Sequence, residues 1–344
     1  MELGVRKLQI LQAIINDYII SAEPVGSRTI AKKYGMGISS ATIRNEMADL
    51  EDMGYLEQPH TSAGRIPSNK AYRLYVDRLM KVKSLSVSEA KYIKEFYEKK
   101  TRQIEQLIFQ TAKILSDITN YTSVVLTPQL NKVLIRRIQL VSLEPEYALL
   151  VIATNSGVLK DSIISIPEGI SPDYLNRISN MLTSVYRGKT FDEIDINTIL
   201  EMQNDIIKDR VFFNSLVDAL TESITANEDR EVYLGGATNI FNFPEYHDVL
   251  KAKAFLDLLE EKEFLYKLLS RPERNGVTVV IGEENEHEDL KECSIVTATY
   301  KIGDRVLGTM GIIGPTRMEY SRVVAVMDHM GKSLSNYLTR LFNK

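Results

Sequence analysis

Residues 25–75 read VGSRTIAKKYGMGISSATIRNEMADLEDMGYLEQPHTSAGRIPSNKAYRLY, and this stretch decides how the chain begins to fold. A helix predicted to start near Ser27 ends at the glycines on either side of Met36, because glycine tolerates the positive φ that closes a helix. A second helix is predicted between Ser39, a good N-cap residue, and Gly54, a good residue just beyond a helix end. The stretch therefore opens with two short helices joined by a glycine turn.

The segments around these two helices complete a compact domain. Residues 55–66 read as a strand, a Gly-tipped turn and a short return strand. Apolar residues recur every three or four positions within residues 4–20, which predicts a further helix, and helical spacing resumes at 72–79. Three helices followed by a hairpin are typical of a winged helix-turn-helix, which we predict over residues 1–83.

The third helix of this domain has two different sides. Ile43, Met47 and Leu50 share one side at helical spacing, and we expect them to pack on the first two helices. The other side carries small and hydrogen-bonding residues that approach a major groove closely, where Arg favours guanine and Asn favours adenine. The expected base-reading residues are Ser40, Thr42, Arg44 and Asn45.

Two further groups of polar residues flank this helix. The first group, at the hairpin tip, is expected to straddle the adjacent DNA backbone or enter the minor groove. The second group, at the start of the second helix and just after the hairpin, is expected to contact phosphates. The tip residues are Thr61, Ser62, Gly64 and Arg65. The phosphate-contacting residues are Ser27, Arg28, Thr29, Lys70 and Arg73. A winged helix used only for protein contacts remains the alternative.

The charge of the 344-residue chain is distributed unevenly. Its length predicts two or three domains, and its net charge is −4. Residues 1–83 hold 12 Lys/Arg and 9 Asp/Glu, which gives a net charge of +3. The remaining residues hold 30 Lys/Arg and 37 Asp/Glu, which gives a net charge of −7. A positive end on a negative body favours a polyanion-binding head, since phosphate contacts dominate nucleic-acid affinity.

Composition also excludes several classes of protein. No apolar run approaches the roughly 18 residues of a membrane helix, and residues 1–20 are too charged for a signal peptide, so we expect a cytoplasmic protein without membrane contact. Cys293 is the only cysteine, which excludes an internal disulfide and a Cys-based zinc site within one chain. We interpret it as a small buried hydrophobe.

Other candidate sites in the sequence are weak. Residues 35–40 imitate a dinucleotide-binding loop but lack the third glycine and a preceding strand, and residues 235–238 lack the ending of a phosphate-binding P-loop. The acidic run 283–289 is interpreted as a solvated loop rather than a cation site. No nucleophile motif and no acid–base pair stands out. We therefore predict no catalytic residue, cofactor or metal, and no enzymatic activity.

The rest of the chain alternates helical and β-rich segments. One long helix is predicted over residues 87–120. Three antiparallel strands at 135–142, 147–154 and 159–166 are followed by helices at 173–186 and 196–226, which predicts a sheet with helices on one face. The remaining elements are strands at 232–235 and 277–282, helical material at 245–269, a hairpin of 294–302 with 305–313, and a helix at 320–341.

The winged-helix stretch, together with LSDITNYTSVVLTP (115–128), YLGGATNIF (233–241) and VLGTMGIIGPTRMEYSRVVAVMD (306–328), resembles the HrcA family of heat-inducible transcription repressors over essentially the whole chain. The resemblance implies a repressor that binds an inverted-repeat operator, the CIRCE element, ahead of chaperone operons. It also implies that the GroEL chaperonin keeps the protein active. A homodimer is expected, because two-fold pairing matches an inverted repeat.

The resemblance also implies an α+β multidomain architecture. Its parts are a winged-helix domain at 1–83, a helical linker at 84–100, a GAF-like α/β domain at 101–128 and 231–344, and an inserted α+β dimerisation domain at 129–230. Two rivals remain open. One is a regulator whose GAF-like domain is gated by a small ligand, and the other is an enzyme with a DNA-binding head.

Overall fold

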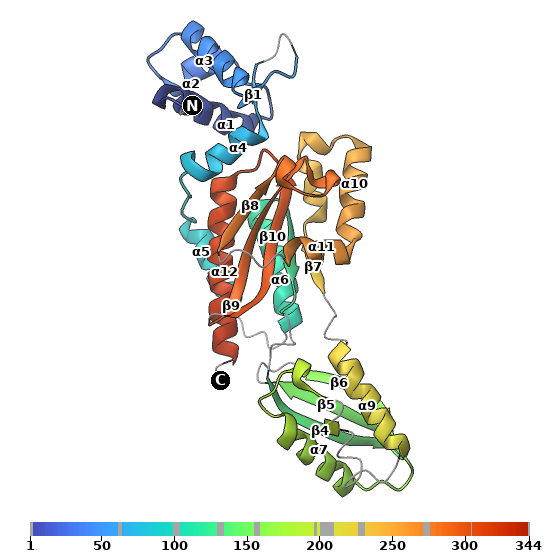
Figure 1. The fold of residues 1–344 in the computed structure, drawn as a ribbon. Coiled ribbons are helices and arrows are strands. Elements are labelled where there is room, and N and C mark those ends of the chain that lie inside the picture. The colour runs from blue at the N-terminus through green and yellow to red at the C-terminus, as the bar shows by residue number, and fades with distance from the viewer. Residues whose placement is uncertain are drawn as a thin grey trace.

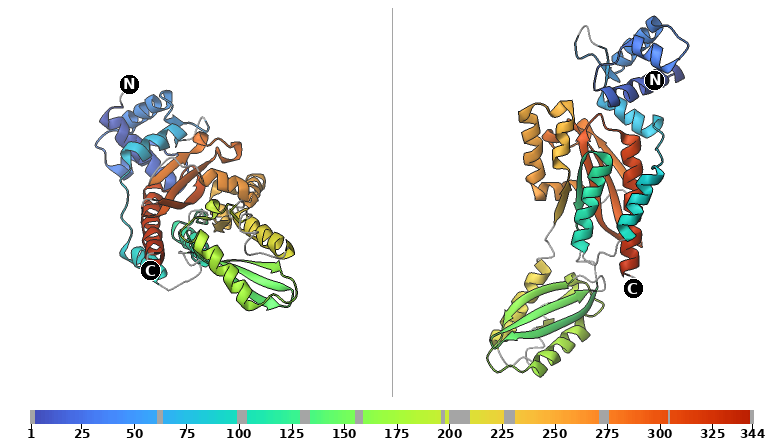
Figure 2. Two further views of the ribbon diagram at one scale, coloured as in Figure 1. Left: turned by 60° about the horizontal axis from the view of Figure 1, so that its bottom comes forward. Right: turned by 180° about the vertical axis from the view of Figure 1, so that it is seen from behind.

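In the computed structural model, an amino-terminal helical head, a central sheet and a smaller sheet unit follow one another (Figures 1 and 2). The structure describes residues 3–60, 64–98, 104–128, 134–154, 159–195, 198–199, 210–225, 231–270, 276–303 and 305–342. Among the helices so described, none combines the length and the apolar character of a membrane-spanning segment.

Three helices and a small hairpin form the head, which confirms the predicted winged helix. The helices are α1 (Val5–Ser21), α2 (Ser27–Tyr34) and α3 (Ser40–Asp52), and the hairpin pairs β1 (Leu56–Glu57) with β2 (Ile66–Pro67) in antiparallel register. The predicted core residues of α3 are buried against apolar side chains of α1 and α2. These core residues include Ile10, Leu11, Ile14, Ile30, Ile43, Met47 and Leu50.

The segment after the hairpin leads from the head to the body. It holds α4 (Asn69–Leu74), which continues into the π-helical turn η1 (Tyr75–Leu79), and then residues 80–86 without helix or strand. The single long helix predicted over 87–120 is wrong, because α5 (Val87–Glu98) and α6 (Ile104–Thr119) are separate helices. The Tyr97 and Thr111 hydroxyl oxygens lie 3.1 Å apart, whereas 14 residues of straight helix span about 21 Å.

A five-stranded antiparallel sheet forms the centre of the body. Its strand order is β7-β3-β10-β9-β8, with β3 (Thr122–Leu126), β7 (Val232–Gly235), β8 (Val277–Ile281), β9 (Cys293–Ile302) and β10 (Arg305–Pro315). Successive side chains of a strand point to opposite faces. Accordingly Val296 packs in one hydrophobic cluster with α6 and α12 (Tyr320–Phe342), and Ile295 packs in another with α10 (Val249–Glu260) and α11 (Lys262–Leu269).

Short 3₁₀ turns connect the strands of the central body. They are η5 (Ala237–Asn242), η6 (Pro244–Tyr246), η7 (Gly282–Glu284) and η8 (Glu288–Leu290). The glycines before η5 lie directly against α6: a Cβ on Gly235 would lie 2.5 Å from the Ala112 carbonyl oxygen. These glycines therefore allow close packing on α6.

The smaller unit is a three-stranded antiparallel sheet with its own hydrophobic core. The strands β4 (Ile135–Glu144), β5 (Tyr147–Thr154) and β6 (Leu159–Ser165) lie in sequence order, as predicted. The helices α7 (Pro172–Tyr186) and α9 (Arg210–Thr225) pack on one face, beside η3 (Phe191–Glu193). Helix α9 lies within the predicted stretch 196–226, part of which falls outside the described residues.

Candidate nucleic-acid interface

Helix α3 presents its polar side to solvent. The Ser39 Oγ accepts a hydrogen bond of 3.1 Å from the Thr42 N–H, which confirms the predicted N-cap, and lies 2.9 Å from the Thr42 hydroxyl. Thr42 is thus engaged in the cap, and Ser40 is half-buried beside it. Arg44 and Asn45 are exposed one turn further along. Both polar side chains can therefore reach outward from this helix.

Helix α2 carries positive charge next to α3. Gly35 and Gly37, with φ of 54° and 68°, make the turn between the two helices. Arg28 and Thr29 are exposed and Ser27 is half-buried at the start of α2. Lys32 is also exposed and lies one helical turn from Arg28, so their side chains share a face. Sequence reasoning missed Lys32, although its i+4 spacing from Arg28 was a usable signal.

Two of the acidic residues of α3, Glu46 and Asp49, are paired with cations of α1. The Lys7 ammonium donates to the Glu46 carboxylate at 2.7 Å and to the Asp49 carboxylate at 2.8 Å, and Arg6 lies 3.6 Å from Glu46. The hydrogen bonds to Asp49 and then Glu46 raise the pKa of Lys7. The carboxylates near the exposed side of α3 therefore repel phosphates less than their number suggests.

The base of the hairpin is fixed tightly against the head. Val25 and Arg65 form a β-bridge with two hydrogen bonds of 2.9 Å, and the Arg65 guanidinium contacts the Glu51 carboxylate at the end of α3. Arg65 is therefore half-buried and sets the hairpin against α3. Of the predicted tip residues, Thr61 and Ser62 lie outside the described residues.

Gly64 meets the backbone of the segment before α2. A Cβ at this position would lie 2.5 Å from the Val25 carbonyl, so the hairpin base requires glycine. We predict that Gly64→Ala lowers the free energy of unfolding by about 1–3 kcal/mol through overpacking. Urea unfolding of the variant measures the loss. Gly4→Ala is the matched control, because nothing lies within 4 Å of its added Cβ, and equal midpoints for the two variants would contradict this account.

The structure separates the two predicted phosphate contacts that follow the hairpin. Lys70 is exposed; its ammonium donates to the Met53 carbonyl at 2.8 Å and lies 4.4 Å from the centre of the Tyr55 ring. Arg73 instead faces the body, where its guanidinium donates to the Glu284 carboxylate and the Val279 carbonyl oxygen. We therefore withdraw Arg73 from the phosphate contacts. Its partner Glu284 is 211 positions away along the chain, so no local pattern revealed the contact.

The structure places three of the weak candidate sites of the sequence: the cysteine, the glycine loop and the acidic run. Burial raises the pKa of the Cys293 thiol to about 11, and the Tyr246 hydroxyl lies 2.9 Å from its sulfur, so the thiol is protonated at neutral pH. Residues 35–40 connect two helices rather than following a strand. Within the described ranges, no three His, Cys, Asp or Glu side chains are arranged to hold a metal ion, the acidic run included.

Two protein-family models match this chain, one over the head and one over most of the remainder. Residues 2–80 match the winged helix-turn-helix transcription repressor, HrcA DNA-binding family, and residues 105–324 match the HrcA protein C-terminal domain family. Full-length relatives are similar over the whole chain. The heat-inducible transcription repressor HrcA of Pelotomaculum thermopropionicum is 46% identical over 99% of this chain and 98% of its own, and that of Ruminiclostridium cellulolyticum is 46% identical over 100% and 99%.

A solved structure shares the fold. The crystal structure of a hypothetical protein at 2.2 Å resolution superposes with a TM-score of 0.69 at 24% identity, covering 99% of this chain and 100% of that one. The arrangement of helices and sheets is therefore not peculiar to this sequence.

Proposed function

This chain belongs to the HrcA family of heat-inducible transcription repressors, and from that membership we propose that it binds, as a homodimer, an inverted-repeat operator of the CIRCE type ahead of chaperone operons. It carries a winged-helix DNA-binding domain, and transcription repression is a non-enzymatic function. The observation that best supports the proposal is the exposed Arg44–Asn45 pair on α3, beside Glu46 and Asp49, whose carboxylates are paired with Lys7 of α1.

In this proposal α3 enters the major groove of each half-site. Arg44 donates to guanine and Asn45 pairs with adenine, while Ser40 allows a close approach and Thr42 holds the helix cap. The hairpin lies along the neighbouring backbone. Its proposed contacts are Thr61, Ser62, Gly64 and Arg65. Footprinting on a promoter with the repeat tests this: two symmetric protected half-sites support it, and a single unsymmetric footprint contradicts it.

Phosphate contacts are assigned to α2 and to Lys70. Arg28 and Lys32 form no ion pair within the described chain, so both charges are available to the DNA backbone, and Ser27 and Thr29 lie at the helix start.

We predict that Arg28→Ala and Lys32→Ala each weaken operator and shuffled DNA alike. Each change also flattens the slope of log K against log salt by about 0.9, because one phosphate is no longer neutralised. Fluorescence anisotropy at four salt concentrations measures the slope. Lys113→Ala, exposed on α6 in the body, is the control with an unchanged slope. A wild-type slope for Arg28→Ala would remove Arg28 from the interface.

The domain organisation proposed for this function keeps the boundaries expected from sequence. The winged helix takes residues 1–83, the GAF-like domain 101–128 and 231–344, and the inserted dimerisation domain 129–230. Strands β3 and β7 pair with each other although the whole unit of β4 to β6 lies between them in the sequence. This pairing supports an insertion of that unit between β3 and β7. The segment 84–100 holds α5, whose Ile93 and Tyr97 are buried in the body, so we propose that it is packed rather than a free linker.

We place the dimer contact on the uncovered face of the three-stranded sheet. The face opposite α7 and α9 carries apolar side chains in register, with Val141 paired to Leu149 and Leu149 to Ile163. An exposed apolar face is typical of an interaction surface. Ile163 is 68% exposed and Val141 46%. The occupant we propose is the same face of a second copy, since an inverted repeat requires a two-fold axis.

The signal in this proposal is the GroEL chaperonin, which heat-damaged proteins draw away so that the repressor loses activity. The protein would act in the cytoplasm, where promoter DNA and the chaperonin are found.

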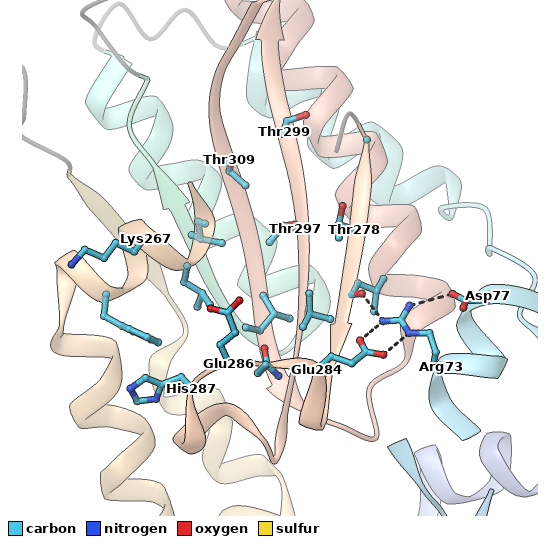
Figure 3. A pocket seen from close by; sticks show the side chains of 18 residues that line it. Arg73, Asp77, Lys267, Thr278, Glu284, Glu286, His287, Thr297, Thr299 and Thr309 are labelled. Carbon is cyan, nitrogen blue, oxygen red and sulfur yellow. Dashed lines mark hydrogen bonds and ion pairs between the residues drawn. The ribbon is translucent and has the colours of Figure 1, made fainter. Parts of the chain in front are cut away.

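A small ligand is the second candidate signal, and one observation favours it. A cavity of about 720 Å³ lies on the central sheet under α11 (Figure 3), within the size range of small-molecule sites. Thr278 pairs with Thr297 and Thr309 with Thr299 across its floor. The Thr299 hydroxyl is buried, and the described residues offer it no hydrogen-bond partner. Thermal shift with purified chaperonin and with a metabolite panel separates the candidates, since a binder of the native state raises the Tm.

A further inference from the structure

The head is attached to the body through Arg73 of α4. The Arg73 Nε donates to Glu284 Oε1 at 2.7 Å, and its Nη2 donates to the second Glu284 oxygen and, at 2.7 Å, to the Val279 carbonyl on the free edge of β8 (Figure 3). Its Nη1 lies 3.2 Å from Asp77. One guanidinium therefore binds a turn, a strand edge and its own helix at once, and such bidentate pairs fix geometry.

A second arginine, which belongs to the body, also contacts the head. Arg317, just before α12, donates from Nη1 to the Ile19 carbonyl near the end of α1 at 2.9 Å. The rest of its guanidinium binds the Glu245 carboxylate and lies 5.6 Å from the centre of the Phe243 ring. Its side chain is 9% exposed, so this contact is desolvated.

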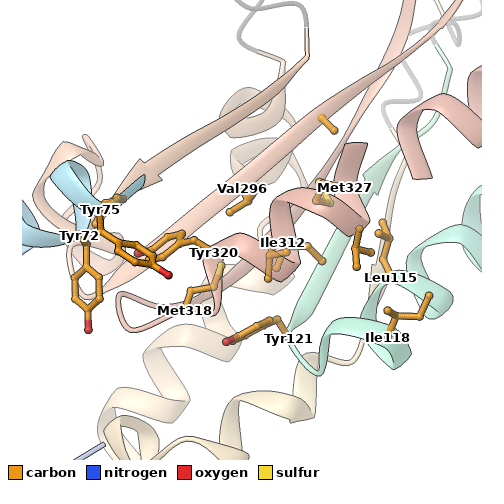
Figure 4. Packing of buried hydrophobic residues seen from close by; sticks show 14 of the residues in the cluster. Tyr72, Tyr75, Leu115, Ile118, Tyr121, Val296, Ile312, Met318, Tyr320 and Met327 are labelled. Carbon is orange, nitrogen blue, oxygen red and sulfur yellow. The ribbon is translucent and has the colours of Figure 1, made fainter. Parts of the chain in front are cut away.

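Aromatic packing also joins α4 to the body. Tyr72 of α4 is fully buried, and its ring centre lies 5.8 Å from that of Tyr320 (Figure 4). The two rings belong to one hydrophobic cluster that runs from the head into the central sheet. On the same side, a Cβ on Gly282, whose φ is +52°, would clash with the Asn69 amide. The head thus rests on the body in one closely fitted orientation.

The covalent connection alone would not hold this orientation. Residues 80–86 have no helix or strand and are fixed to the body at Lys83, whose N–H donates to the Ser321 carbonyl oxygen at 3.2 Å and whose ammonium contacts the Glu319 carboxylate at 2.5 Å. Residues 80–82 lie between this anchor and the head, and three extended residues still reach up to about 11 Å. Without the contacts above, the head would be a tethered domain that samples many positions. Two tethered heads would bind half-sites at many separations, because effective concentration then depends on reach rather than on a fixed geometry.

We propose that Arg73 and Arg317 are positioning residues that set which half-site spacing the repressor accepts. By holding each winged helix on its central sheet, they fix the distance and the angle between the two copies of α3 in a dimer. This inference rests on the proposed dimeric operator binding. Neither arginine contacts DNA in it.

Operators with altered spacing test the inference with full-length protein. Inverted repeats with the wild-type gap, and with the gap changed by 2 and by 5 base pairs, are titrated against wild type, Arg73→Ala and Glu284→Ala. Wild type is expected to lose about 10-fold in affinity or more on each altered repeat, and both variants to lose about threefold or less. Lys251→Ala, which removes an exposed ion pair with Glu292 elsewhere on the body, is the control that keeps wild-type selectivity.

A readout without DNA separates failure of this inference from failure of the proposed function. Trypsin cleavage at the exposed Lys81 should be at least about threefold faster in Glu284→Ala, because a freed head lets residues 80–86 leave their folded path and fit the active site of the protease. Wild-type cleavage rates with wild-type spacing selectivity in both variants would overturn the inference. Loss of half-site affinity in Arg73→Ala with a shallower salt slope would also overturn it, by restoring Arg73 to the DNA. If the wild type binds no repeat but Glu284→Ala is cleaved faster, the operator proposal is refuted. The attachment of the head to the body through Arg73 and Glu284 would still hold.

Discussion

Ile163→Glu is expected to leave the protomer folded and to split the dimer. Ile163 is 68% exposed on the uncovered sheet face, so a glutamate there disturbs little within one chain. Across the proposed two-fold contact it places two carboxylates in an apolar interface, where burying a charge is costly. Because a dimer on an inverted repeat gains avidity from its second head, operator affinity should fall by about 10²–10⁴-fold.

Sedimentation velocity and operator titration measure the two halves of this prediction. The matched control is Val211→Glu, which makes a similar change at a position 62% exposed on α9 of the same unit. Circular dichroism should show the same helix and strand content in both variants. A dimeric Ile163→Glu with wild-type operator affinity would place the dimer contact elsewhere.

Arg44→Ala is expected to cost about 1–3 kcal/mol of operator affinity per half-site and to blur the preference at one base position. The reason is that an arginine bidentate to guanine distinguishes bases, while the exposed alanine replacing it does not. Helix α3 itself should survive, since Arg44 is exposed beside the buried face rather than part of it and alanine is a good helix former. Binding to a set of single-base operator variants measures the lost discrimination.

Arg28→Ala is the control for Arg44→Ala, because it removes a charge from the neighbouring helix without a proposed base contact. Equal loss for Arg44→Ala on operator and shuffled DNA would reduce Arg44 to a phosphate contact.

Local sequence signals were sufficient for the head. The cap at Ser39, the glycine at 54 and the three- and four-residue spacing of Ile43, Met47 and Leu50 act over short distances, and all three appear in α3 as predicted. Alternating apolar residues with turns between them likewise predicted β4, β5 and β6, because each strand buries one side on α7 and α9.

Long-range contacts were beyond the reach of the same signals. Arg65 and Arg73 look alike in the sequence, as cations that flank the hairpin, yet Glu51 engages one and Glu284 the other. The separation of α5 from α6 was missed because no Pro or Gly occurs between residues 87 and 120 to mark a break. Packing of α5 on α12 overrides the uniform helical pattern, and that packing partner lies over 200 residues away.

The central claim, that two copies read a repeated site together, is tested most directly by one titration series at fixed salt. Purified protein is titrated with the inverted repeat, with a single half-site and with a shuffled duplex of equal length. The account predicts that the inverted repeat binds at least about 100-fold tighter than the half-site, and that the half-site binds tighter than the shuffled DNA. Equal affinity for all three duplexes, with the protein folded and supplied with chaperonin, would contradict it.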